Sequence, residues 1–155
     1  HLLGRRQRQM CIRDSKKAAK NKHIKAILGV GDLETLRNVA KASMVCMMAG
    51  ADFIKTSTGK ESINANLNNS LVMLRMIREF YQMTGKKIGF KPAGGISTAK
   101  TVIEFLILVM EELGHDWINP KYLRIGASSL LIDIERQLYH FALGRYANKE
   151  KLAIG

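Results

Sequence analysis

The sequence predicts an α/β fold with a parallel sheet, either half of a (β/α)₈ barrel or a small doubly wound sheet. Short apolar segments alternate four times with longer segments of helical period between Lys16 and Gly144. Only crossover helices return the chain in the same direction, so this alternation favours parallel pairing. The repeat is also regular, because Lys91 follows Lys55 by 36 residues and Ser128 follows Lys91 by 37. A complete barrel uses eight such units in about 250 residues, so four units correspond to half of one.

The first predicted unit joins a strand over residues 24–28 to a helix over residues 34–48. The strand is a short apolar run that ends at two closely spaced glycines, which is typical of a buried strand and a turn. Asp32 is of a type that caps helices, and Gly50 lies just beyond the predicted end. The apolar stripe of this helix consists of Leu36, Val39, Ala40 and Met47.

The three later units follow the same pattern, and a glycine-bearing turn follows each strand. The predicted strands are residues 51–56, 87–92 and 122–125, and the predicted helices are residues 67–83, 98–113 and 128–143. Each helix has an apolar stripe at helical spacing. In the first of these helices the stripe consists of Leu71, Leu74, Ile77 and Tyr81.

The composition excludes several classes of protein. With 155 residues, of which 46% are hydrophobic, the chain can form one domain and is not intrinsically disordered. No apolar run reaches the roughly 18 residues of a membrane-spanning helix. Two cysteines cannot build a disulfide framework, and the four histidines lack the spacing of metal ligands. We expect a cytoplasmic protein that binds no metal, no other cofactor and no membrane.

The net charge of +12 is concentrated at one end of the chain. Residues 1–25 hold nine of the 25 Lys and Arg residues and a single Asp. A basic nucleic-acid-binding segment is an alternative interpretation, but no aromatic side chains alternate with the lysines of residues 16–25. Residues 1–15 show no clear helical or strand period. Residues 5–14 (RRQRQMCIRD) match the in-frame translation of a transposon adapter, so we expect residues 1–15 to be non-native, residues 16–144 to form the domain and residues 145–155 to form a tail.

Two lysines stand inside neighbouring predicted strands near their carboxyl ends. Lys55 stands in the strand end FIKT (residues 53–56), and Lys91 stands in the strand end GFKP (residues 89–92). In parallel α/β folds the active site lies at these strand ends, and adjacent strands are about 4.8 Å apart. A lysine amine attacks a carbonyl only in its neutral form, which burial and a second nearby cation favour. The pair therefore indicates nucleophilic catalysis through a Schiff base rather than two solvated lysines.

Three glycine-bearing turns follow the same strand ends. They are residues 57–60 (STGK), 93–95 (AGG) and 126–129 (GASS). Each precedes a predicted helix, so together they can aim backbone N–H groups at one anion. Barrel phosphate sites are commonly built from such loops. We therefore expect a substrate that carries both a carbonyl and a phosphate.

The three motifs closely resemble those of the deoxyribose-phosphate aldolase family, in its animal-type branch. They are residues 51–60 (ADFIKTSTGK), 89–96 (GFKPAGGI) and 124–131 (RIGASSLL), and the similarity extends over about residues 24–146. The resemblance implies that the chain carries about the last four βα units of a (β/α)₈ barrel. It also implies a metal-free class I aldolase that converts 2-deoxyribose 5-phosphate into acetaldehyde and glyceraldehyde 3-phosphate, in the catabolism of deoxyribonucleotides.

The resemblance also implies a role for each site residue. Lys55 corresponds to the Schiff-base nucleophile, and Lys91 to the cation that favours the neutral amine and relays protons. The residues that correspond to phosphate ligands are Thr58, Gly59, Lys60, Gly94, Gly95, Gly126, Ser128 and Ser129. Another phosphate-binding Schiff-base lyase on a barrel is the alternative enzyme.

The sequence departs from the family pattern in three places. Residues 28–31 (LGVG) replace the usual Glu-Thr pair before the glycine, and no terminal tyrosine is present. Nothing matches the first four strands of the family or the relay aspartate that they carry. We therefore expect this chain to be an incomplete and inactive part of the enzyme, and its copies to associate into homo-oligomers.

Overall fold

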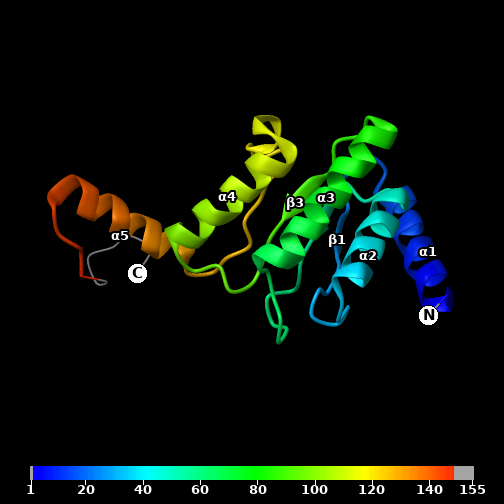
Figure 1. Ribbon diagram of the computed structural model, residues 1–155, viewed down its shortest axis with the longest axis horizontal. Coiled ribbons are helices and arrows are strands. Elements are labelled where there is room, and N and C mark those ends of the chain that lie inside the picture. Colours follow the sequence, from blue (N-terminus) through cyan, green and yellow to red (C-terminus); the bar gives the residue numbers. More distant parts are fainter. Residues whose placement is uncertain (1, 149–155) are drawn as a thin grey trace.

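The computed structural model describes residues 2–148 as a row of helices beside a short parallel sheet (Figure 1). The helices are α1 (Leu2–Ala19), α2 (Leu36–Met48), α3 (Leu67–Thr84), α4 (Ala99–Leu113) and α5 (Leu130–Leu143), with a 3₁₀ turn η1 (His115–Trp117) after α4. The strands are β1 (Lys25–Ile27), β2 (Phe53–Lys55) and β3 (Gly89–Lys91). Helices α1 and α5 lie at opposite ends of the row. Most of the predicted tail, residues 149–155, lies outside the described residues. Among the helices described, none has the length and apolarity that a membrane crossing requires.

The three strands form one parallel sheet in the order β1-β2-β3, which confirms the predicted parallel pairing. The predicted strand over residues 122–125 does not form as a strand. It is reduced to two isolated parallel bridges, Phe90 to Leu123 and Ala93 to Gly126. A strand at the edge of a sheet has a neighbour on one side only, so fewer hydrogen bonds hold it extended.

The core lies between the sheet and the helices. Ala26, Ile54 and Phe90, the middle residues of the three strands, are buried in one apolar cluster with residues of α2, α3 and α4. The residues on either side of them in each strand point to the opposite face, because side chains alternate along a strand. That face, which we call the inner face, is partly open, since the Ile27 side chain is 50% exposed.

Helix α2 begins later than the sequence predicted. Its cap is Thr35, whose Oγ1 accepts a hydrogen bond from the backbone N–H of Asn38, and not Asp32. Glu34 stands just before this cap with a left-handed φ of 60°, so the chain turns sharply before the helix starts. The prediction failed because Asp and Thr are both good caps and only the path of the loop selects between them.

Among the stripe residues named above for the helices over residues 34–48 and 67–83, Leu36 and Tyr81 are exposed rather than buried, at 47% and 36%. Leu36 is the first residue of α2, where the helix extends beyond the packed core. In α3 the buried side includes Met73, Leu74, Ile77 and Phe80. The buried side of α3 is therefore rotated slightly from the predicted stripe. Phe80, which has the more apolar side chain, is covered in place of Tyr81.

Helix α1 includes residues 2–15, for which the sequence indicated no regular structure. Its residues are mainly Arg, Gln, Leu, Ala and Lys, which have high intrinsic helix propensity despite the lack of an apolar stripe. Lys16 forms an ion pair with Asp52, and Ile12 packs against the core. The helix thus depends on local propensity and a few contacts near its end. The proposed non-native origin of residues 1–15 stays a prediction.

Trp117, the single tryptophan of the chain, connects η1 to β3. Its indole N–H donates a hydrogen bond of 2.9 Å to the backbone carbonyl of Ile88, and the side chain is 4% exposed. The ring packs edge-on against Tyr81 at a centroid distance of 5.3 Å. The Lys87 Nζ lies 4.8 Å from the indole centroid. These contacts hold the beginning of β3 against the helical layer.

Replacement of Gly89 by alanine should destabilise the sheet by about 1–3 kcal/mol. A Cβ at this position would collide with Cε1 of Phe53, whose side chain is 2% exposed, so the ring would have to move. The shift of the urea midpoint measures the effect. In a Phe53→Leu background the same replacement should cost much less, because the smaller side chain leaves room. Equal costs in both backgrounds would contradict this packing.

Candidate functional site

Lys55 and Lys91 stand directly opposite each other at the carboxyl ends of β2 and β3. The strand register pairs their Cα atoms, and both side chains are partly buried. Two residues earlier in the same strands, Phe53 and Gly89 are also paired, and these positions face inward as well. The expected matching height of the two lysines is therefore confirmed. Their charges are brought together by backbone pairing alone, before any side-chain adjustment.

A hollow of about 480 Å³ opens beside Lys55, and we call it the loop hollow. The three predicted glycine-bearing turns contribute to its wall, so residues far apart in the chain meet there. Lys55 and all eight residues predicted to bind phosphate line it, namely Thr58, Gly59, Lys60, Gly94, Gly95, Gly126, Ser128 and Ser129. Lys91 does not line the hollow. It lies next to it, since a Cβ on Gly126 would be only 3.0 Å from Lys91 Cε.

Buried hydroxyl groups fix the turn after β3 onto the end of β2. Thr56 Oγ1 accepts a hydrogen bond of 3.0 Å from the backbone N–H of Ala93, and the Ser57 hydroxyl donates one of 2.7 Å to the Ala93 carbonyl. Both Thr56 and Ser57 are completely buried. The positions of Lys55 and of the 93–95 turn are thus coupled through a short, water-excluded network.

The backbone N–H groups of the turns are not all available to an anion, contrary to the expectation from sequence. Gly94 N–H donates to the carbonyl of Gly126, and Gly126 N–H donates to that of Pro92. These bonds replace the missing ladder between β3 and residues 122–125. The N-terminus of α5 is different. Its N-cap, Ser129, makes no capping side-chain bond, whereas Thr35, Asn66 and Thr98 cap α2, α3 and α4. The open donors at α5 face a hollow suited to a phosphate group.

Two cations on the inner face were missed by the sequence analysis. Lys25 pairs with Phe53 in the register of β1 and β2, and its Nζ lies 5.5 Å from the Phe53 ring centroid. The guanidinium carbon of Arg124 lies 5.1 Å from the same centroid. The alternation of side chains along a strand, which predicted that Lys55 faces inward, predicts the same for Lys25 when it is applied to the first strand. The same alternation along residues 122–125, with Leu123 buried, would have placed Arg124 on the inner face as well, although not its contact with Phe53.

The inner face therefore carries a cluster of positive charge. Burial lowers the pKa of Lys25, and the charges of Lys91, Arg124 and Lys55 lower it further. A lysine whose folded-state pKa lies below its unfolded value of 10.5 binds its proton less readily in the folded chain. At neutral pH the charge of Lys25 therefore lowers the free energy of unfolding. This destabilising contribution becomes smaller as the pH rises from the lowered pKa to 10.5, since the unfolded chain then loses the proton as well.

Lys25→Met should raise the thermal midpoint at pH 7 by roughly 1–3 °C. Methionine keeps an unbranched apolar side chain over Phe53 and removes the charge that the other three cations repel. The gain should shrink as the pH approaches 10.5. Lys41→Met, which removes an exposed charge from the middle of α2, is the control and should change the midpoint little at either pH. A loss of stability in Lys25→Met at pH 7 would contradict the repulsion.

Comparison with known proteins shows close relatives in animals. The family model described as DeoC/LacD family aldolase matches residues 4–133. The chain is 60% identical over 136 residues to deoxyribose-phosphate aldolase of Homo sapiens, and 61% identical over 132 residues to that of Mus musculus. These alignments cover 88% and 85% of this chain but only 43% and 42% of the relatives. The chain thus spans less than half the length of the curated relatives it matches.

Solved structures agree on the architecture. A Toxoplasma gondii ME49 protein described as a deoxyribose-phosphate aldolase superposes with a TM-score of 0.80 at 24% identity, over 89% of this chain and 54% of that one. A Coccidioides immitis protein described in the same way gives 0.59 at 27% identity, over 78% and 41%. The fold is that of a (β/α)₈ barrel, of which these residues form about half. Since the family model matches most of its length, the chain belongs to the DeoC/LacD family of aldolases.

Proposed function

We propose that these residues act in a metal-free class I aldolase that cleaves 2-deoxyribose 5-phosphate to acetaldehyde and glyceraldehyde 3-phosphate. The observation that carries the proposal is the direct pairing of Lys55 with Lys91 beside the loop hollow. One edge of the sheet thereby offers an amine nucleophile, a neighbouring cation and an anion site. The identity to animal deoxyribose-phosphate aldolases supports the choice of substrate. A cytoplasmic role in deoxyribonucleotide catabolism is part of the same proposal.

In the proposed reaction, the neutral amine of Lys55 attacks the C1 aldehyde of the open-chain sugar. Loss of water gives an iminium ion, which withdraws electrons from the C2–C3 bond. As the C3 hydroxyl loses its proton, this bond breaks and glyceraldehyde 3-phosphate leaves. The remaining enamine takes up a proton at C2, and hydrolysis releases acetaldehyde and restores the amine. Lys91, directly opposite Lys55, favours the neutral amine and holds protons during these transfers.

The phosphate of the substrate is proposed to lie in the loop hollow. Lys60 supplies a point charge there, and the uncapped N-terminus of α5 supplies backbone donors near Ser128 and Ser129. This placement holds the phosphate away from the reacting carbons. Its binding energy can then be used to orient the aldehyde toward Lys55.

The sheet described here does not close a barrel, so the proposal is best tested by complementation. The chain is produced together with the part of the human relative that lies outside the match, and release of glyceraldehyde 3-phosphate is measured. The combination should cleave deoxyribose 5-phosphate, whereas either part alone should not. A combination in which Lys55→Met is as active as the unchanged sequence would exclude the proposed chemistry.

Lys60→Ala should raise the KM for deoxyribose 5-phosphate by roughly tenfold in the complemented barrel. The lost ammonium group contributes to binding of the phosphate and touches no reacting atom in the proposal. Unphosphorylated deoxyribose is the internal control, and its kcat/KM should change less than about threefold. Equal losses on both substrates would place Lys60 outside the phosphate site.

A further inference from the structure

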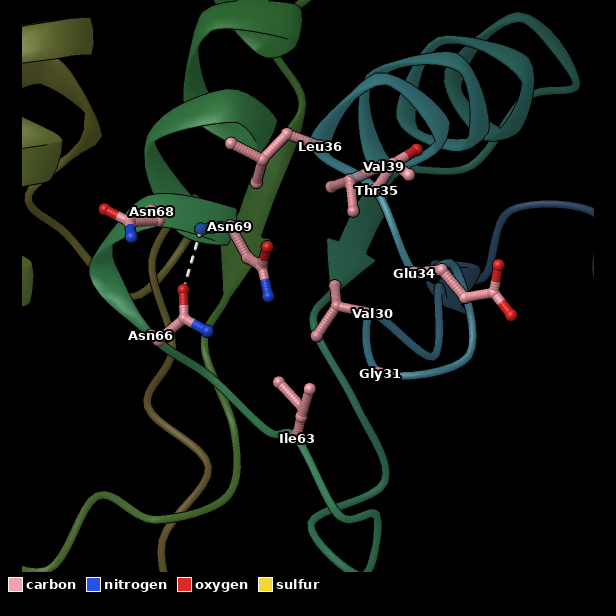
Figure 2. A pocket seen from close by; sticks show the side chains of 10 residues that line it. All are labelled: Val30, Gly31, Glu34, Thr35, Leu36, Val39, Ile63, Asn66, Asn68 and Asn69. Carbon is pink, nitrogen blue, oxygen red and sulfur yellow. Dashed lines mark hydrogen bonds between the residues drawn. The ribbon is translucent and has the colours of Figure 1, made fainter.

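A second hollow lies between the starts of α2 and α3, and Figure 2 shows it from close by. Its volume is about 210 Å³, and it shares no lining residue with the loop hollow. We call it the interhelix pocket. Its walls come from the turn after β1, the segment before α3 and the first turns of the two helices. Nothing in the proposed aldolase reaction uses it.

Two helix N-termini meet at this pocket. Thr35 caps α2 and Asn66 caps α3, and each side chain accepts one backbone N–H, those of Asn38 and Asn69. Among the described residues, the first two backbone N–H groups of each helix have no recorded acceptor. Both helices are long, with 13 and 18 residues, so two positive dipole ends converge here. Such an arrangement favours an anion.

The Asn69 side chain provides a second, independent observation. Asn69 is 9% exposed, and no hydrogen bond of its carboxamide is recorded among residues 2–148. Figure 2 shows this carboxamide pointing into the space between the helices, whereas that of Asn68 points away. Its amide atoms are not fully enclosed by protein, and the exposure that they keep is toward the pocket. The Asn69 amide is therefore positioned to donate to a group that occupies the pocket.

The rest of the lining limits what that group can be. Val30 and Val39 are buried at 4% and 1% exposure, and Ile63 lies across from them. These apolar side chains can pack against a ligand but cannot form hydrogen bonds with it. Phosphate has no apolar part to place against them, so on that side of the pocket it would lose hydration without compensation. The exposed carboxylate of Glu34 points out of the pocket, so it opposes an anion only weakly.

We propose that the interhelix pocket binds a short-chain aliphatic carboxylate. The carboxylate accepts hydrogen bonds from the Asn69 amide and from the open N–H groups at the starts of α2 and α3. The alkyl chain packs against Val30, Val39 and Ile63. The small volume favours about four or five carbons, since each buried methylene adds to the affinity until the space is filled.

The test uses butyrate as the probe and saturation-transfer difference NMR as the measurement, with the full chain. This method detects binding to a monomer and to an assembled form alike. Butyrate should give a saturable signal that is strongest at its methyl group. Butyramide, which has the same shape without the charge, should bind at least roughly tenfold more weakly. Inorganic phosphate should not displace butyrate at equal concentration.

Matched variants locate the site. Asn69→Asp keeps the shape of the side chain, suits the first turn of a helix, and should weaken butyrate binding roughly tenfold or more through charge repulsion. Asn68→Asp adds the same charge one residue away, where the side chain points outward, and should weaken it less than about threefold. Asn69→Leu should abolish binding with little change in the thermal midpoint, because among residues 2–148 the amide makes no hydrogen bond that the folded chain would lose.

Three results would overturn the proposal. They are the absence of a saturable butyrate signal, equal affinity for butyrate and butyramide, and equal weakening by Asn69→Asp and Asn68→Asp. The last result would assign the binding to the general positive charge of the chain rather than to the interhelix pocket.

Discussion

Borohydride reduction of this chain with acetaldehyde should fix a two-carbon adduct on Lys55. Lys55 combines partial burial with the direct strand pairing to Lys91, and it borders the loop hollow through which a small aldehyde can enter. Exposed lysines such as Lys22 and Lys100 border no such hollow and should react far more slowly. Peptide mapping by mass spectrometry reads the position of the adduct.

The same residue should dominate the kinetics. In the complemented barrel, Lys55→Met should lower kcat by roughly 10⁴-fold or more, because no other group can form the covalent intermediate. The trapped adduct should disappear with it. An adduct on Lys91 would exchange the roles assigned to the two lysines. Adducts spread over the exposed lysines would show that Lys55 has no special reactivity.

Lys91→Leu should lose most of the activity of the complemented barrel, about 10²–10³-fold at neutral pH. Leucine fills similar space at the end of β3 but removes the cation that faces Lys55 in the register. In the proposed reaction this variant lacks both the cation beside the nucleophile and the group that holds protons, and the steady-state kcat at neutral pH measures the loss.

Lys91→Arg is the informative companion variant. It keeps the positive charge but cannot give up a proton at these pH values, so it separates the electrostatic role from the proton relay. If Lys91→Arg restores the borohydride trapping that Lys91→Leu loses, but does not restore turnover, Lys91 has both the electrostatic role and the proton-relay role. A Lys91→Leu enzyme within a few-fold of the unchanged rate would show that neither role exists.

Much of the fold could be predicted because the local signals agreed with one another. Glycines after each strand and apolar stripes in each helix gave the order of the elements and the parallel pairing. Three features could not be predicted, namely helix α1, the choice of Thr35 over Asp32 as a cap, and the loss of the strand over residues 122–125. The first has no apolar stripe, the second depends on the path of a loop, and the third depends on a neighbouring strand.

The candidate site was predictable where it rests on strand periodicity. Lys55 and Lys91 each lie one residue before the end of a predicted strand, so counting along the sequence was enough to place them opposite each other. The hydrogen bonds that use the N–H groups of Gly94 and Gly126 were not predictable, since they depend on how residues 122–126 meet β3. The position of Arg124 over Phe53 is likewise a product of tertiary packing.

Trp117 gives the chain an intrinsic optical reporter of its candidate site. It is the single tryptophan, and its indole N–H donates a hydrogen bond to the carbonyl of Ile88, the residue just before β3. Lys91 ends that strand. An indole that moves from this buried site into water should emit at longer wavelength, and the adjacent Lys87 ammonium should make the emission sensitive to small displacements. Any event that shifts β3, whether aldehyde capture, docking of the rest of a barrel or unfolding, can therefore be followed by fluorescence without a label.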